Sequence, residues 1–81
     1  MNLKLIFGEV LKEKRKEIDI SQEQLALKSN LDRTFISKLE RGIHQPSLES
    51  LFMIAKVLEC SPTELVIQVE RKLGNKDFSE L

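Results

Sequence analysis

Apolar residues recur along this chain at intervals of three and four, the spacing that places side chains on one face of an α-helix. Near the start of the chain, this spacing predicts a helix over residues 3–17 with a core side made of Leu3, Phe7, Val10 and Leu11. In residues 30–42, "NLDRTFISKLERG", the apolar arc consists of Leu31, Phe35, Ile36 and Leu39. The opposite arc of the same segment carries Arg33, Thr34, Ser37, Lys38 and Arg41. One face of this helix is built to be buried, and the other needs a different explanation.

Two capping boxes mark the starts of helices. Ser21 is followed three residues later by Gln24, so the serine oxygen can accept from a helical amide while the glutamine side chain accepts from the serine amide. A short second helix is predicted from there to residue 28 or 29. Ser61 and Glu64 repeat the arrangement, with Pro62 at the first helical position. They predict the start of a fifth helix.

The middle of the chain contains further helix boundaries. Asn30 occupies a turn where φ is expected to be positive, which asparagine tolerates better than most residues. Asp32 is predicted to cap a third helix and Gly42 to end it. Ser47 is predicted to cap a fourth helix over residues 48–59, whose apolar positions at helical spacing are Leu48, Leu51, Ala55 and Leu58.

These boundaries predict an all-α chain of five short helices, with only 3 glycines and 2 prolines to interrupt them. The 81 residues form one small domain, which can bury only about 60–65% of its unfolded surface. The folded domain is expected in residues 1–74 and a C-terminal tail, frayed or docked on a partner, in residues 75–81. Because so small a core is marginally stable, a partner subunit is expected.

The formal net charge is zero, which counts mildly against a nucleic-acid partner. The distribution is uneven, however. Residues 1–45 contain 9 Lys/Arg and 7 Asp/Glu, whereas residues 46–81 contain 4 and 6. The N-terminal half is therefore slightly basic and the C-terminal half slightly acidic.

The sequence gives little support to several function classes. The single cysteine, Cys60, is expected to be a small buried hydrophobe, and the single histidine, His44, has no partner at metal-ligand spacing, so neither a metal nor a cofactor is expected. No glycine-rich phosphate loop or nucleophile–base pair supports an enzyme. No apolar run approaches the roughly 18 residues of a membrane span, and a cytoplasmic location is expected.

The second and third predicted helices are joined by about three residues, which requires a tight corner. Ala26 faces this corner, where a larger side chain would push the two helices apart. Apolar contacts that fix the angle are expected from Leu25, Leu31, Ile36 and Leu39. This is the helix-turn-helix arrangement, in which the second helix presents its polar face outward.

The segment "SQEQLALKSNLDRTFISKLERGIHQPSLESLFMIAKVLECSPTEL" resembles the Cro and phage-repressor-like (XRE-type) helix-turn-helix family. The shared elements include Ser-Gln, Leu-Ala, Ile-Ser, Glu-x-Gly, Pro-Ser-Leu and Ser-Pro-x-x-Leu, and the match as a whole covers roughly residues 7–69. The chain departs from the family pattern at Asn30, where Gly is usual, and at Cys60, where Val or Ile is common. The resemblance implies a lambda-repressor-like DNA-binding domain. Within the family, "NLDRTFIS" and the short chain are most similar to restriction–modification controller proteins.

The resemblance gives the polar face of the third helix a role, because the major groove of DNA admits a helix. Arg33 and Lys38 are expected to donate to guanine edges. Ser37 can pair with donor or acceptor groups on a base edge, and the methyl of Thr34 can contact a thymine methyl. Phosphate contacts are expected from Gln22, Arg15, Arg41, His44 and Gln45. Arg15 and Glu40 match family positions that form an ion pair between the first and third helices. Phe35 is expected to be partly buried.

The resemblance implies a homodimeric transcriptional regulator that binds a pseudo-palindromic operator, with two recognition helices about 34 Å apart. The apolar stripe of the fifth helix is expected to supply the dimer interface, although it could also close the core of the monomer; it contains Leu65, Val66, Val69 and Leu73. No small-molecule effector is evident. A restriction–modification controller and a small phage-type repressor both remain open. The alternative is an antitoxin or protein-interaction module with the same fold, favoured by the neutral charge and disfavoured by the basic face of the third helix.

Overall fold

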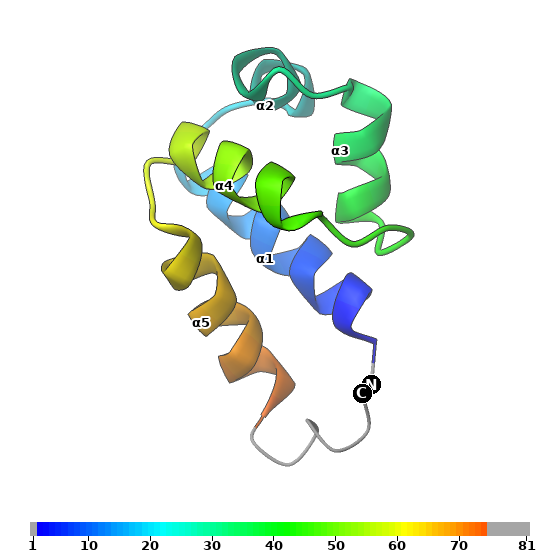
Figure 1. Ribbon diagram of the computed structural model, residues 1–81, viewed down its shortest axis with the longest axis vertical. Coiled ribbons are helices and arrows are strands. Elements are labelled where there is room, and N and C mark those ends of the chain that lie inside the picture. Colours follow the sequence, from blue (N-terminus) through cyan, green and yellow to red (C-terminus); the bar gives the residue numbers. More distant parts are fainter. Residues whose placement is uncertain (1, 75–81) are drawn as a thin grey trace.

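The computed structural model describes residues 2–74, which form five α-helices (Figure 1). In chain order they are α1 (Leu3–Glu17), α2 (Gln22–Ser29), α3 (Arg33–Glu40), α4 (Leu48–Val57) and α5 (Pro62–Leu73). The predicted all-α, five-helix fold is therefore confirmed. The predicted tail over residues 75–81 lies outside the described residues.

Most helix starts follow from local capping. Both predicted capping boxes are present, Ser21 with Gln24 on α2 and Ser61 with Glu64 on α5. The prediction for Asp32 was wrong in part, since it is the N-cap residue of α3 but its side chain makes no capping hydrogen bond. Helix α4 ends at Val57, two residues earlier than predicted.

Helix α1 lies at the centre of the bundle and packs against both α3 and α5 (Figure 1). Helix α2 packs against α3 and α4, and α4 also contacts α5. The core between them contains fourteen buried apolar residues, Ile6, Phe7, Val10, Leu11, Leu25, Ala26, Ile36, Leu39, Ile54, Ala55, Leu58, Leu65, Val69 and Leu73. Each fully buried leucine or isoleucine contributes about 1.5–3 kcal/mol of transfer free energy, so this cluster is the main source of stability.

The fourth helix buries Ala55 and Leu58 as expected but differs from the sequence-based expectation at its first residue. Leu48 is 73% exposed, although it was grouped with the apolar positions of this helix. Ile54, which was not in that group, is fully buried instead. Leu48 lies in the first turn of α4, at the edge of the bundle, where no neighbouring helix covers it within the described part of the chain.

Non-glycine residues with positive φ follow three of the helices. Asn30, as predicted, has φ of 58° and follows α2, and its neighbour Leu31 donates its amide to Ala26 O over 2.9 Å. Asp19 after α1 and Glu59 after α4 also have positive φ, which the sequence analysis did not predict. These turns fix the angles at which consecutive helices meet.

The first helix approaches α3 closely at one glycine. A Cβ added to Gly8 would lie 2.5 Å from the carbonyl oxygen of Leu39 and 2.7 Å from that of Glu40. Only glycine allows the backbone of α1 to come so near the C-terminal end of α3. The position of α3 in the molecule therefore depends on this contact. Among residues 2–74, no helix is both long enough and apolar enough to cross a bilayer.

Candidate nucleic-acid interface

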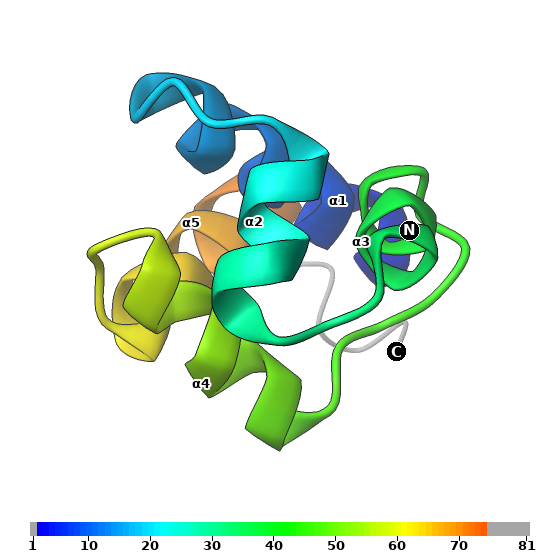
Figure 2. The ribbon, with the colours of Figure 1, turned by 90° about the horizontal axis from the view of Figure 1, so that it is seen from above.

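Helices α2 and α3 meet at the tight corner that the sequence predicted. Viewed from above, α2 leads through a short turn into α3, and the two helices lie at a steep angle to each other (Figure 2). Ala26 is buried at this corner, and Ile36 and Leu39 hold α3 to the core. The apolar side of α3 is therefore buried in the protein interior, and its polar side faces outward.

The exposed side of α3 has the composition expected for contacts to base edges. Arg33 and Thr34 are exposed, and Ser37 and Lys38 are half-buried. Phe35 is half-buried against the core, as expected. An open polar hollow of about 280 Å³ lies beside this surface, and it is lined by Gln22, Arg33, Thr34, Ser37 and Arg41. Residues from α2, α3 and the position after α3 thus surround one polar recess.

Lys38 is placed differently from Arg33, Thr34 and Ser37. It does not line the hollow, and its backbone carbonyl accepts the amides of Ile43, over 2.9 Å, and His44, over 3.4 Å. These bonds draw the chain after Gly42, whose φ is 75°, back across the end of α3. His44 and Gln45 are both exposed on the loop that follows α3, and Gln45 also lines an apolar pocket on another side of this loop.

A largely buried charged pair joins α1 to α3. Arg15 of α1 donates from Nε to Glu40 Oε2 over 2.7 Å and from Nη2 to Glu40 Oε1 over 3.0 Å. Its Nη1 donates to Ile20 O over 2.8 Å. The hydrogen bond to Glu40 raises the pKa of Arg15 above its usual value, which favours the charged guanidinium. Only 11% of the Arg15 side chain is exposed, which leaves it little surface for the phosphate contact expected from the sequence.

The same carboxylate also accepts a bond from α2. Gln22 donates from Nε2 to Glu40 Oε1 over 3.1 Å. Gln22 was expected to contact phosphate, and the structure ties it to the ion pair as well. Sequence reasoning missed this link, because Gln22 and Glu40 are eighteen residues apart and no spacing rule connects them.

The expected dimer stripe on α5 needs correction. Leu65, Val69 and Leu73 are buried in the core of the chain itself, because α5 packs against α1 and α4. Val66, at 52% exposed, is the one member of the four that faces outward. The other three close the core of the monomer.

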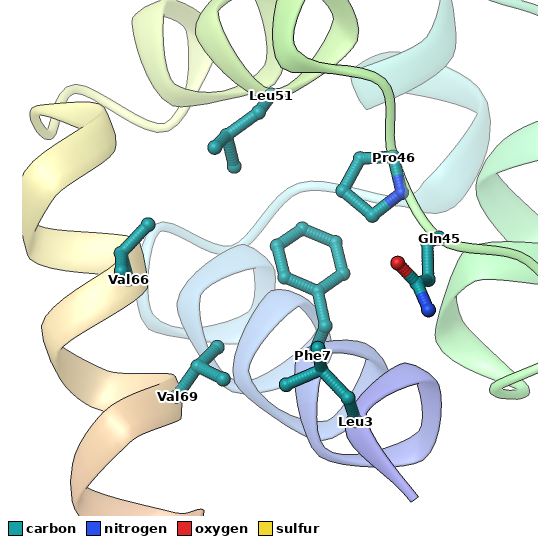
Figure 3. A pocket seen from close by; sticks show the side chains of 7 residues that line it. All are labelled: Leu3, Phe7, Gln45, Pro46, Leu51, Val66 and Val69. Atoms are coloured by element: carbon teal, nitrogen blue, oxygen red, sulfur yellow. The ribbon is translucent and has the colours of Figure 1, made fainter. Parts of the chain in front are cut away.

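An exposed apolar surface does exist beside α5. Leu48 and Phe52, one helical turn apart on α4, are 73% and 56% exposed. Between α1, α4 and α5 lies an apolar pocket of about 200 Å³ (Figure 3), lined by Leu3, Phe7, Gln45, Pro46, Leu51, Val66 and Val69. We call Leu48, Phe52, Val66 and this pocket the α4–α5 surface.

In residues 2–74, no three His, Cys, Asp or Glu side chains are grouped as a metal site would require. Cys60 packs partly against the core, and burial is the main reason that the pKa of its thiol is raised. A thiol with a raised pKa is a poor nucleophile at neutral pH.

The model of the helix-turn-helix family matches residues 11–65. The chain belongs to the Cro and phage-repressor-like helix-turn-helix family. Control protein C.BamHI of Bacillus amyloliquefaciens is 38% identical to it over 66 residues, which cover 80% of this chain and 82% of the relative.

Two further relatives extend this family match. Control protein C.MunI of Mycoplasma sp is 39% identical over 72 residues, which cover 88% of this chain and 97% of the relative. The crystal structure of the restriction-modification controller protein C.AhdI from Aeromonas hydrophila is 39% identical, with a TM-score of 0.75 over 76% of this chain and 94% of that one. The residues matched by the helix-turn-helix family model, 11–65, include all of α2, α3 and α4.

Proposed function

We propose that this helix-turn-helix protein is a sequence-specific DNA-binding transcriptional regulator that acts as a homodimer on a pseudo-palindromic operator. The observation that carries the proposal is the orientation of α3. Its apolar side is buried against α1 and α2, and its polar side, with Arg33 and Thr34 exposed, faces away from the protein. Such a helix fits the major groove of DNA, which is about 12 Å wide.

Base recognition is assigned to four residues on that face. Arg33 and Lys38 donate to guanine O6 and N7, because a guanidinium or ammonium matches two adjacent acceptors. Ser37 pairs with either kind of edge, and the methyl of Thr34 packs against a thymine methyl. Arg33, Thr34 and Ser37 line one recess, which supports their action on neighbouring base pairs.

Phosphate contacts surround the recognition helix. Gln22 lies in the first turn of α2, where backbone amides without helical partners also point toward an anion. Arg41 and the loop residues His44 and Gln45 are exposed at the other end of α3. Arg15 supports this interface chiefly by holding Glu40, since most of its surface is buried.

The α4–α5 surface is the proposed dimer interface, in place of the stripe along α5. A two-fold axis brings the same patch of each subunit together, so a large apolar side chain beside a pocket can enter the partner's pocket. Leu48 and Phe52 are large, exposed side chains of α4, the helix whose Leu51 lines the pocket, and Val66 of α5 lines it too. Covering these residues removes an apolar patch that would otherwise stay in water.

A restriction–modification controller is the favoured biological role. C.BamHI and C.MunI, both control proteins, are matched over 82% and 97% of their own lengths, so their size and this chain's are similar. A regulator of this kind responds to its own concentration, through dimerisation and occupancy of the operator. A small phage-type repressor works by the same physics, and the genes beside this one distinguish the two.

The first experiment is binding of the purified protein to the DNA upstream of its own gene and to a scrambled duplex, at several salt concentrations. We expect saturable binding with a large operator-to-random ratio and a steep dependence on salt, since phosphate contacts release counterions. Equal affinity for both duplexes contradicts sequence-specific regulation. In that case a pull-down for a protein partner tests the interaction-module alternative, which the neutral net charge favours.

A further inference from the structure

We infer that Glu40 is a positioning residue for DNA binding, which orients the side-chain amide of Gln22 toward the phosphate backbone. The inference rests on the proposed phosphate contact of Gln22. It gives the buried carboxylate a function beyond the ion pair with Arg15. Glu40 itself does not touch DNA, because only 4% of its side chain is exposed.

The geometry at Glu40 leaves one orientation for the glutamine. Oε1 of Glu40 accepts from both Gln22 Nε2, over 3.1 Å, and Arg15 Nη2, over 3.0 Å, while Oε2 accepts from Arg15 Nε. Three donors from two different helices therefore converge on one carboxylate. Since Arg15 is fixed by a further bond to Ile20 O, the carboxylate cannot turn away from Gln22 without breaking several bonds.

The chemistry of the carboxylate determines which end of the amide faces it. An ionised carboxylate only accepts hydrogen bonds, so it binds the NH2 group of Gln22 and repels its carbonyl oxygen. A free glutamine rotates broadly about its last side-chain torsion and presents nitrogen and oxygen almost equally. Glu40 removes that freedom. The second N–H of the same nitrogen is then available to a phosphate oxygen, which also only accepts.

The charge of the site suits this role. A lone carboxylate close to the DNA backbone would repel phosphate, but the charge of Glu40 is balanced by Arg15 in a bidentate pair. Gln22 also lines the polar hollow beside Arg33 and Thr34, on the side where DNA is expected. The glutamine therefore bridges a buried, neutralised pair and the recognition surface.

A double-mutant cycle tests the inference on DNA affinity. In the wild-type background, Gln22→Ala is expected to weaken binding about tenfold, and equally on operator and random DNA, because it removes a bond to a charged phosphate. The second background is Arg15→Met with Glu40→Met, because replacing a buried ion pair by apolar residues is often neutral for stability. In that background, Gln22→Ala is expected to cost less than about twofold, since the glutamine is no longer oriented.

His44→Ala is the matched control, because His44 is another proposed phosphate contact and its backbone amide bonds to Lys38 O and not to the Glu40 carboxylate. Its effect is expected to be the same in both backgrounds. An equal loss from Gln22→Ala in both backgrounds overturns the inference while leaving the proposed function intact. Failure of the proposed function would appear differently, as an operator-to-random ratio near one in the wild-type protein.

Two further measurements keep the inference testable if the methionine pair does not fold. Glu40→Asp retains the charge but withdraws the carboxylate by one methylene, and it is expected to weaken the effect of Gln22→Ala in the same way. In the wild-type protein, the side-chain amide protons of Gln22 are expected to differ clearly in NMR chemical shift and exchange rate from those of the exposed Gln45. Amide protons of Gln22 that match those of Gln45 would overturn the inference.

Discussion

Gly8 of α1 lies so close to the end of α3 that a Cβ at this position would come within 2.5 Å of Leu39 O. The contact involves backbone on both sides, so neither helix can yield by rotating a side chain. It sets the distance between the central helix of the bundle and the helix proposed to enter the DNA groove. A glycine on α1 thus controls the placement of the recognition surface.

Gly8→Ala is therefore expected to destabilise the protein and to displace α3. Forcing an extra carbon into a packed contact costs about 1–3 kcal/mol, even though alanine is the better helix former. Urea unfolding measures the loss, and operator binding measures the displacement. Lys12→Ala, at an exposed position of the same helix, is the control. If the Gly8→Ala protein is as stable as the Lys12→Ala protein, α1 and α3 can move apart without loss of free energy of unfolding, which contradicts the prediction.

Arg33→Ala is expected to reduce binding to the operator specifically, whereas Gln22→Ala is expected to reduce binding to any DNA. Loss of a guanidinium that contacts a guanine costs about 1–3 kcal/mol on the operator and relaxes preference at one base step. Loss of Gln22 removes a phosphate contact and weakens operator and random DNA alike. Titrations of both variants on both duplexes measure this. If Arg33→Ala lowers the affinity for operator and random DNA equally, Arg33 does not contact bases.

Phe52→Ser is expected to weaken the dimer. The side chain is 56% exposed in the single chain, so its replacement costs the monomer fold little while removing apolar area from the α4–α5 surface. Sedimentation equilibrium of the variant should show a shift toward monomer. Leu27→Ser is the matched control, because Leu27 is 81% exposed on α2, outside this surface. If Leu27→Ser dissociates the protein and Phe52→Ser does not, the interface lies elsewhere.

Asn30→Gly is expected to stabilise the protein. Asn30 adopts φ of 58°, a conformation that costs an L-residue roughly 1 kcal/mol and costs glycine very little. Part of the gain is lost because glycine has more freedom in the unfolded chain, so an increase of a few tenths to about 1 kcal/mol is expected. Urea unfolding measures it. A net loss of stability would indicate that the asparagine side chain itself holds the turn.

Local features explain why so much of the fold could be predicted. The helix over residues 3–17 and the boxes at Ser21 and Ser61 depend on residues three or four positions apart, and the structure contains all three. The positive φ of Asn30 was likewise predicted from one residue in its turn. Capping failed at Asp32, because the residue type allows a side-chain bond but the surrounding turn decides whether it forms.

The candidate site divides in the same way. Helical periodicity separated the polar face of α3 from its apolar face, and the structure exposes Arg33 and Thr34 as that pattern indicated. The pattern on α5 was misleading, because a stripe that closes the core and a stripe that binds a partner look the same in sequence. Only the packing of α5 against α1 and α4 distinguishes Leu65, which is buried, from Val66, which is exposed.

By itself, the sequence determined the helices, their caps, the tight corner and the resemblance to a family, because each of these follows from residues close together in the chain. Tertiary structure alone decided three other features. They are the backbone contact at Gly8, the exposure of Leu48 and Phe52, and the convergence of Arg15 and Gln22 on Glu40. Each of these depends on how separate helices pack, and the angles and distances between helices follow from the whole core and from no short segment of it.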